Sequence, residues 1–463
     1  MESIASHWRK QLAAGSKPAY LGIADLIAED LKSGRLVAGD QLPTLRELAE
    51  DLELNYTTVA RAYTEARKRG LIEARPGMGS FVRSKAPSPP LRAGSDLEMT
   101  MNLPPEPREA GLIERLKQCA ATVCARQDLY ELLRYQDFGG KPHEREVAAE
   151  WLRPWLPDVA GERLLVAPGI HGALVGLLSQ LARPGETVCV EALTYPGIKA
   201  IATQLGINLH PLPLDEDGPS AAAFEEACKR LQPRAFHLNP VMRNPDMGTI
   251  SRARLEALAD VALRYNVPLI EDDAYGMLPR QRPPALAVLV PELTYYVTGF
   301  SKFLGAGLRT AFVVAPDVRQ IQRLAGTLRA MTVMASPVTT AIVTQAIADG
   351  TASAMLAAVR QESQARQTLA DKHLAPYHYR AQAEGFHLWL SVPPSWSMVE
   401  LASYLRTKGI GAVASVAFAT DGNPPVAVRL CLGGPSGRED CDAALRLVAD
   451  TLDHPMHPHA TAV

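Results

Sequence analysis

The chain has 463 residues, of which 47% are hydrophobic and 21% charged, and its formal net charge at pH 7 is −2. This length exceeds one ordinary compact domain, so two or more are expected, and the near-neutral charge does not by itself indicate a nucleic-acid partner. The six cysteines form no CxxC pair, which argues against a disulfide framework and against a metal site. The N-terminus lacks the apolar core of a signal peptide, and polar residues interrupt the most apolar window, 164–182, so we expect a cytoplasmic protein with no membrane partner.

The first predicted elements are helices of a small N-terminal unit. Apolar residues at helical spacing predict a helix over 20–31. Thr44 is expected to be the N-cap of a second helix, with Glu47 completing a capping box, and Asn55 opens a third helix. Two short helices joined by a tight turn are typical of a helix-turn-helix.

Two short β-prone runs, 71–74 and 80–83, flank a Pro/Gly turn and predict a hairpin, the wing. In such units the second helix of the motif enters the major groove with its N-terminal residues at base edges. Amides, hydroxyls and guanidinium groups supply the donors and acceptors that bases and phosphates need. Each polar residue alone is more often simply exposed, but their order and spacing together favour DNA binding. The candidate DNA-binding residues are Arg46, Thr44, Asn55, Tyr56, Thr57, Thr58, Arg61, Arg75, Gly77 and Gly79.

Residues 33–82, from SGRLVAGDQLPTLRELAE to RPGMGSFV, resemble the GntR family of winged-helix regulators. The resemblance implies that Arg46, Thr58, Arg61 and the glycines of the wing contact an operator in double-stranded DNA. The chain departs from the family pattern at Glu53, where glycine is usual, and at Tyr56, which would alter the base preference.

Residues 84–101 begin with a stretch rich in Pro, Ser and Gly, show no apolar periodicity and predict a linker. It divides a helix-turn-helix unit, 1–83, from a second unit, 102–463. Helical and strand patterns alternate in the second unit, which predicts an α/β fold with a mostly parallel sheet and crossover helices. Strands are expected at 163–166, 187–191, 235–238, 268–271, 295–298 and 311–315, with helices such as 172–182 and 252–265 between them.

Two of these strands end in residues that suggest chemistry. One is followed by Ser301 and Lys302, with Arg309 seven positions after the lysine, which suits an amine beside a phosphate site. Another ends at Asp272, where open α/β sheets place ligands, although such an acid alone could equally be a helix cap. An amine, an anion, a ring-oxygen donor, a stacking aromatic and a phosphate cradle are what pyridoxal phosphate requires.

The segment GFSKFLGAGLRTAF resembles the lysine segment of class I aminotransferases, and the likeness extends over about 103–452. It implies that Lys302 is catalytic and carries pyridoxal phosphate. It implies a fold type I aminotransferase-like domain in which Asp272 holds the pyridine nitrogen, Tyr275 and Asn244 contact the ring oxygen and Tyr195 stacks on the ring. The other implied cofactor-binding residues are Ser301, Arg309, and the backbone amides of Ile170 and His171 at a helix N-terminus.

Two further residues come from the same resemblance. Tyr135 lies in a segment whose tyrosine reaches the phosphate of the neighbouring subunit, so a homodimer is implied. Arg429 lies on a predicted strand and matches the arginine that binds a ligand carboxylate, although a structural ion pair is the alternative. In the same way, His171 could be a structural histidine and Asn244-Pro245 a structural turn.

Both units in this order resemble the MocR subgroup of GntR regulators. The expected function is a pyridoxal-phosphate-dependent transcription regulator that senses an amine, an amino acid or the cofactor itself. An active aminotransferase with an accessory DNA-binding domain is the alternative. A scaffold without cofactor is weaker, because Lys302, Asp272 and Tyr275 are all present.

Overall fold

The computed structural model describes residues 4–13, 18–33, 35–36, 40–69, 71–75, 79–82, 99–126 and 129–454. The chain divides into two compact units, 1–93 and 94–463, and each is described by itself. The expected wing residue Gly77 and residues 84–98 of the expected linker lie outside the described residues. The same holds for the side chain of Arg75, whose backbone lies in a strand.

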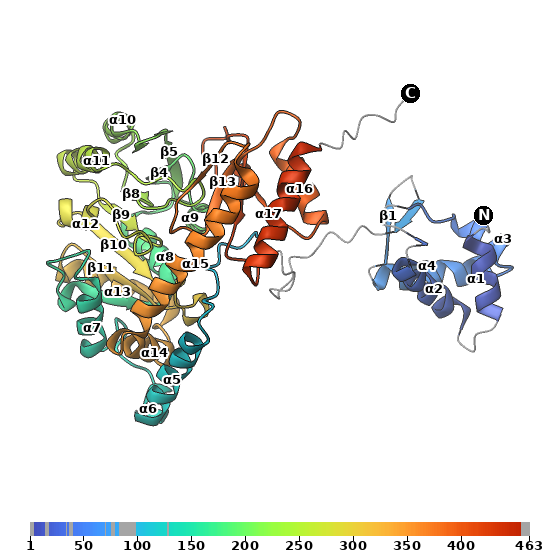
Figure 1. The fold of residues 1–463 in the computed structure, drawn as a ribbon, viewed down its shortest axis with the longest axis horizontal. Helices are drawn as coiled ribbons and strands as arrows, with labels where there is room; N and C mark the ends of the chain where they lie inside the picture. The colour runs from blue at the N-terminus through green and yellow to red at the C-terminus, as the bar shows by residue number, and fades with distance from the viewer. Residues whose placement is uncertain are drawn as a thin grey trace. The chain divides into compact units, whose positions relative to one another are not determined.

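The N-terminal unit is a helical bundle with a two-stranded wing (Figure 1). Its elements are α1 (Ile4–Ala13), α2 (Ala19–Ser33), α3 (Leu45–Asp51), α4 (Tyr56–Lys68), β1 (Ile72–Arg75) and β2 (Gly79–Val82). The expected capping box is confirmed, because Thr44 caps α3 and exchanges hydrogen bonds with Glu47. Helix α1 was not predicted. Its Trp8 is fully buried and donates to Asp30 Oδ2 over 2.7 Å, so α1 contributes to the core of this unit.

The second unit is built on a seven-stranded sheet in the order β3-β11-β10-β9-β8-β4-β5 (Figure 1). Only β11 runs antiparallel to its neighbours, so the expected mostly parallel sheet is confirmed. The strands are β3 (Leu164–Ala167), β4 (Thr187–Glu191), β5 (Asn208–Leu212), β8 (Ala235–Leu238), β9 (Leu269–Asp272), β10 (Thr294–Gly299) and β11 (Ala311–Val314).

Helices cover both faces of this sheet, because alternate strand residues point to opposite sides. Leu165 and Ala167 pack with α8, α9 and α13, whereas Leu164 and Val166 pack with helices on the other face. The helices of the first face are α8 (Gly169–Leu181), α9 (Pro196–Leu205) and α13 (Val318–Thr332). Those of the other face are α5 (Ala110–Arg126), α7 (Pro142–Leu152), α10 (Ala221–Leu231), α11 (Arg252–Tyr265), α12 (Leu286–Leu289), α14 (Pro337–Ala348) and α15 (Thr351–Leu374).

A smaller antiparallel sheet, in the order β12-β13-β15-β14, forms a C-terminal subdomain that the sequence analysis did not separate. It contains β12 (Tyr379–Ala381), β13 (His387–Ser391), β14 (Val413–Ala414), β15 (Ala427–Cys431), α16 (Met398–Thr407) and α17 (Arg438–Asp453). Met99 is buried in its core and accepts a hydrogen bond from Cys431 N, so the last residues of the expected linker, 99–101, are part of this fold.

The remaining elements are α6 (Leu129–Leu132), the short pair β6 (Leu214–Asp215) and β7 (Gly218–Pro219), and 3-10 turns at Gly161–Arg163, Ala306–Leu308 and Ser415–Ala417. Within the described ranges no single helix has the length and apolarity to cross a membrane. Only α14 and α15 taken together meet that test, and they are bent by 81°.

Candidate functional site

A cavity of about 360 Å³ lies beside the carboxyl ends of the parallel strands. This is the edge at which open α/β sheets bind ligands. The C-terminal subdomain lines it too, through Val413, Phe418 and Arg429. The cavity brings together almost every residue predicted for the cofactor and its ligand: Lys302, Asp272, Tyr275, Asn244, Tyr195, Ser301, Arg309, Ile170, His171 and Arg429. Tyr135 does not line it, and its side chain is 81% exposed.

Lys302 follows β10 and extends into this cavity. Its Nζ donates to the backbone carbonyl of Asn102 over 2.8 Å and lies 5.2 Å from the centre of the Tyr275 ring. Burial lowers the pKa of Lys302 to about 8, and the positive charge of Arg429 acts in the same direction. A lysine with a lowered pKa supplies more of the neutral, nucleophilic amine at physiological pH.

Asp272, the last residue of β9, is buried and faces the cavity. Its Oδ2 lies 3.5 Å from Nε2 of His237 on β8, while Oδ1 is buried with no partner. A buried carboxylate oxygen without a donor is costly unless a ligand supplies one, and a protonated pyridine nitrogen is such a donor. The sequence analysis missed His237, because one histidine in a buried strand shows no spacing that marks it.

The phosphate end of the cavity is formed by α8 and Arg309. The structure begins α8 at Gly169, three residues before the expected start, so Ile170 and His171 lie in its first turn. Gly169 has φ +82°, and a Cβ there would lie 2.8 Å from Arg309 Nη2, so only glycine allows this approach. Among the residues that the structure describes, no carboxylate pairs with Arg309. A free guanidinium beside unsatisfied helix N–H groups suits a phosphate.

Tyr195 caps the start of α9, and the His171 ring meets it edge-on at a centroid distance of 6.4 Å. Burial lowers the pKa of His171, as does the nearby Arg309. The neutral imidazole therefore packs beside the aromatic predicted to stack on the ring. Apart from this contact with Tyr195, the structure identifies no role for the His171 side chain.

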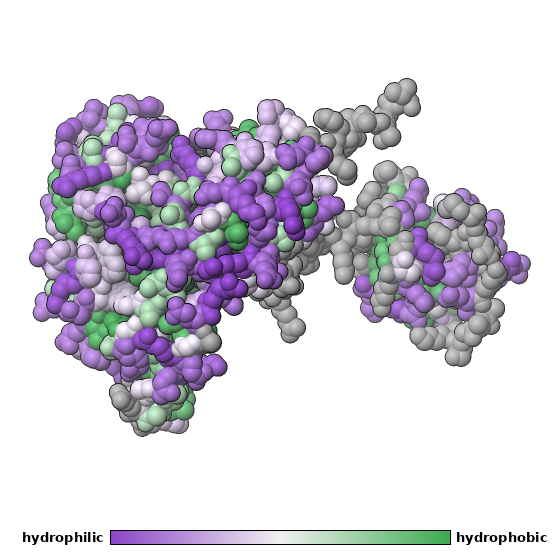
Figure 2. Space-filling model, in the orientation of Figure 1, coloured by the Kyte–Doolittle hydropathy of each residue, from purple (hydrophilic) through white to green (hydrophobic). Residues whose placement is uncertain are grey.

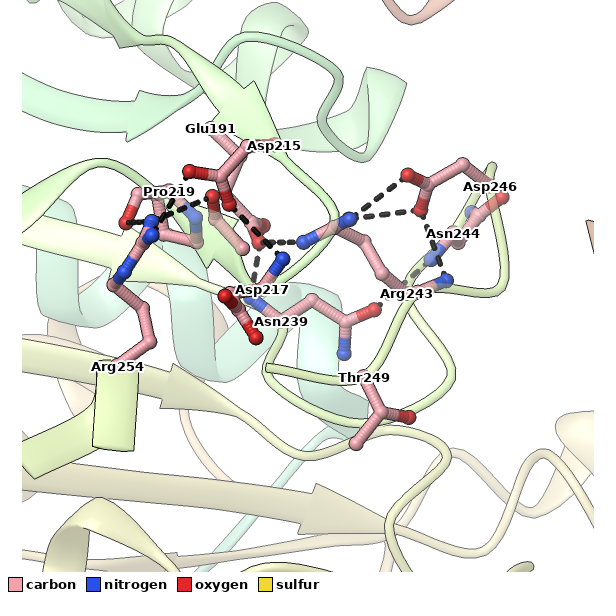
Figure 3. Close-up of polar contacts among 12 residues, drawn as sticks. Glu191, Asp215, Asp217, Pro219, Asn239, Arg243, Asn244, Asp246, Thr249 and Arg254 are labelled. Carbon is pink, nitrogen blue, oxygen red and sulfur yellow. Dashed lines mark hydrogen bonds and ion pairs between the residues drawn. The ribbon is translucent and has the colours of Figure 1, made fainter. Parts of the chain in front are cut away.

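Arg243 organises the turn that carries Asn244 (Figure 3). Its buried guanidinium donates to both carboxylate oxygens of Asp246 over 2.8 Å and lies 3.4 Å from Glu191 Oε1. Asp246 is therefore the fixed partner of a buried charge. Asn239 completes the turn, since its Oδ1 accepts from Asn244 N and its Nδ2 donates to the carbonyl of Asp272. Burial raises the pKa of Glu191 to about 7, although Arg243 opposes this shift.

Arg429 lies on β15 at the other end of the cavity, as the predicted strand implied. Nη1 donates to Asn244 Oδ1 over 2.7 Å and Nη2 to the Thr100 carbonyl over 2.5 Å, while Nε is buried without a partner. No acidic side chain pairs with it among the described residues, so the structural ion pair considered from the sequence is absent there. The guanidinium thus keeps a donor for a ligand carboxylate.

These residues fit pyridoxal phosphate on structural grounds. A buried carboxylate oxygen of Asp272 without a partner, a glycine that leaves room beside Arg309, and Lys302 with its lowered pKa all line the same cavity. When bound, the group supplies an electron sink for reactions at an amine carbon. The residues that would hold it are Lys302 for the aldehyde carbon, Asp272 for the ring nitrogen, and Arg309 with the start of α8 for the phosphate.

In the N-terminal unit the predicted DNA-binding residues gather at α3 and the start of α4. Asn55 is the N-cap of α4; Tyr56, Thr57 and Arg61 are exposed, and Thr58 is half-buried. The Arg61 guanidinium lies 4.6 Å from the centre of the Tyr20 ring, a cation–π contact that the sequence did not indicate. Thr44 and Arg46 are exposed at the start of α3, and Gly79 opens β2 with φ +109°.

Fold and pocket give the second unit the architecture of class I aminotransferases, a class whose members use pyridoxal phosphate. Residues 98–446 match the model of aminotransferase class I and II, and residues 19–82 match that of bacterial regulatory proteins of the gntR family. The chain therefore belongs to the aminotransferase class I and II family, joined to a gntR helix-turn-helix domain in the manner of the MocR subfamily of GntR regulators.

Related proteins resemble both units of the chain. The uncharacterized HTH-type transcriptional regulator YdeF of Bacillus subtilis is 26% identical over 98% of both chains. The vitamin B6 salvage pathway transcriptional repressor PtsJ of Salmonella typhimurium is 29% identical over 63% of this chain and 66% of its own. The structure of an archaeal alanine:glyoxylate aminotransferase superposes with a TM-score of 0.71 at 22% identity, covering 77% of this chain and 90% of its own.

Proposed function

We propose that this chain is a cytoplasmic transcription regulator that binds operator DNA through α3, α4 and the wing, and holds pyridoxal phosphate on Lys302. A small amine, an amino acid or pyridoxal phosphate itself is the signal. The observation that carries the proposal is the pocket. It is lined by Lys302, by the Asp272 oxygen that has no partner, and by Arg309, which has no carboxylate partner among the described residues. The N-terminal part of the same chain matches the gntR family.

Two hydrogen bonds near the pocket support the idea that the large unit senses a ligand and does not merely store the cofactor. Residues 99–103 include the described end of the expected linker, and the carbonyls of Asn102 and Thr100 accept hydrogen bonds from Lys302 and Arg429, respectively. A ligand that engages these two side chains competes with that stretch. Such a ligand changes DNA affinity only if it favours one arrangement of the chain over another.

The experiment uses the full-length protein loaded with pyridoxal phosphate. Its affinity for the DNA upstream of its own and neighbouring genes is measured by fluorescence anisotropy, first alone and then with a panel of amino acids, amines and pyridoxal compounds. Specific binding that at least one compound alters is expected. Absence of specific binding to any upstream segment would contradict the regulatory role.

The cofactor assignment has its own test. Loaded wild-type protein should show a visible absorption band, and reduction with borohydride should leave the cofactor's mass on the peptide that contains Lys302. Lys302→Ala should lose both signals, whereas Lys117→Ala, an exposed lysine on α5, should keep them. A band that survives in Lys302→Ala would place the attachment elsewhere.

An active aminotransferase is the second candidate. It is favoured by the same Lys302, whose lowered pKa also suits proton transfer, and by a 2-aminoadipate transaminase of Thermus thermophilus that is 34% identical over 41% of this chain. Steady-state formation of a keto acid from a compound that leaves DNA binding unchanged would favour the enzyme.

A homodimer is part of the proposal. Tyr135 is exposed and away from its own pocket, as a residue that serves a neighbouring subunit must be. Leu129, Tyr130 and Leu133 nearby are also exposed, at the tip of the large unit where Figure 2 shows apolar residues on the surface. Light scattering of the wild type against Leu133→Asp tests this surface, because a buried charge weakens an interface.

A further inference from the structure

Asn102 was not singled out from the sequence, yet its side chain lies among the polar groups of the pocket. Its Nδ2 donates to the hydroxyl oxygen of Tyr275 over 2.7 Å and lies 3.3 Å from Nδ1 of His387. An amide nitrogen carries two protons, and these two partners use both.

His387 is the second partner of the Asn102 amide. His387 is fully enclosed, and burial holds its pKa well below the usual range, an effect that Arg429 reinforces. A neutral imidazole has one nitrogen with a lone pair, and in the tautomer protonated at Nε2 this is Nδ1, which accepts from the amide. The structure places the nitrogen of Asn102, rather than its oxygen, toward both His387 and Tyr275.

The hydrogen bond from Asn102 determines how the Tyr275 hydroxyl is oriented. Its oxygen accepts from Asn102, so its own O–H proton is left to point at another acceptor. Tyr275 is buried, and burial raises the pKa of its hydroxyl, which keeps that proton in place. Tyr275 is the residue assigned to the ring oxygen of the cofactor, and an anionic ring oxygen needs a donor.

The backbone around Asn102 is held by hydrogen bonds from three residues. Its own carbonyl accepts from Lys302 Nζ, the Thr100 carbonyl accepts from Arg429, and the Met99 carbonyl accepts from Cys431 N. Gly433 lies so close to Leu103 that a Cβ there would be 1.9 Å from the Leu103 carbonyl oxygen. The side-chain amide of Asn102 is thus carried by a backbone segment that is fixed in place.

We propose that Asn102 is a positioning residue of the cofactor pocket, which orients the Tyr275 hydroxyl as a donor toward the ring oxygen of pyridoxal phosphate. This inference rests on the proposed cofactor site. It concerns a residue outside the lysine, aspartate and arginine segments, and it assigns a purpose to the buried His387, which accepts the second proton of the amide.

The test compares Asn102→Asp with wild-type protein. The aspartate keeps the shape but replaces the donor with an acceptor, which draws the Tyr275 proton away from the cofactor. We expect pyridoxal phosphate to bind about tenfold more weakly, the loss of one buried hydrogen bond. We also expect the pH at which the bound cofactor's visible spectrum titrates to rise, because its anionic ring oxygen loses a donor. Asn423→Asp makes the same change on an exposed loop and should leave both unchanged.

A double-mutant cycle keeps the inference testable if Asn102→Asp folds poorly. Asn102→Ala should weaken cofactor binding in wild type but hardly at all in Tyr275→Phe, since the hydroxyl through which it acts is gone. Additive effects in the two backgrounds, or an Asn102→Asp protein with unchanged affinity and spectrum, would overturn the inference and leave the cofactor site standing. Wild-type protein that takes up no pyridoxal phosphate would overturn both.

Discussion

Nη1 of Arg429 donates a 2.7 Å hydrogen bond to Oδ1 of Asn244, 185 residues earlier in the chain. The bond joins the small C-terminal sheet to the turn after β8 across the cavity. Both side chains are buried, and the centre of the Phe418 ring lies 5.1 Å from the guanidinium carbon of Arg429. A ligand that engages Arg429 therefore acts on a residue expected to contact the cofactor ring.

The first prediction concerns the ligand carboxylate. Arg429→Ala should weaken the binding of amino acids to the loaded protein by at least about tenfold, because a charge-assisted pair is lost. Amines of the same side chain without a carboxylate should bind about as well as before. Titration of the visible spectrum with each pair of compounds measures both affinities. Equal losses for the amino acid and the amine would show that Arg429 serves the pocket structurally.

The second prediction is a pH dependence. Attack on an aldehyde requires the neutral amine, which exists above the pKa of the lysine. Burial lowers the pKa of Lys302 to about 8, so the rate at which cofactor-free protein captures pyridoxal phosphate should rise with pH and approach its plateau above about 8. Stopped-flow absorbance measured from about pH 6 to about pH 10 follows this rate. A profile still rising steeply near pH 10 would indicate a lysine of ordinary pKa.

The third prediction concerns the recognition helix. Arg61→Ala should reduce affinity for the specific operator by about 1–3 kcal/mol, the cost of one lost base contact. Arg69→Ala removes the same charge from the end of α4, where Arg69 is paired with Asp25 and Glu65 inside its own unit. It should change affinity much less. Anisotropy titrations at several salt concentrations separate the two effects, and equal losses for both variants would point to a general charge effect.

The fourth prediction compares two acids drawn in Figure 3. Asp246→Ala leaves the buried Arg243 without its bidentate partner and should lower the free energy of unfolding of the large unit by about 3–5 kcal/mol. Asp215→Ala breaks an ion pair of 2.8 Å to Arg254, but Asp215 is exposed, so the loss should stay below about 1 kcal/mol. Urea unfolding followed by tryptophan fluorescence gives both values. Similar midpoints would mean that the Arg243 pair is not critical.

Features determined by neighbouring residues could be predicted from the sequence. The capping box of Thr44 and Glu47, the alternation of strands and helices, and the segment around Lys302 depend on interactions within a few residues. Their patterns can therefore be recognised in the linear sequence. The same holds for Asp272 and Arg309, because the end of a parallel strand identifies the edge of the sheet where ligands bind.

The tertiary structure alone decided which distant residues meet. Asn102 and Lys302 are 200 positions apart, and nothing periodic in the stretch after the linker marks Asn102 as part of the pocket. His237 reaches Asp272 only because β8 and β9 are neighbours in the sheet, and Trp8 is buried only because α1 packs on the helical unit. The role of Asp246 is visible only in the fold, where the buried Arg243 lies beside it. Burial and long-range pairing set the energies of these groups, and a linear pattern contains neither quantity.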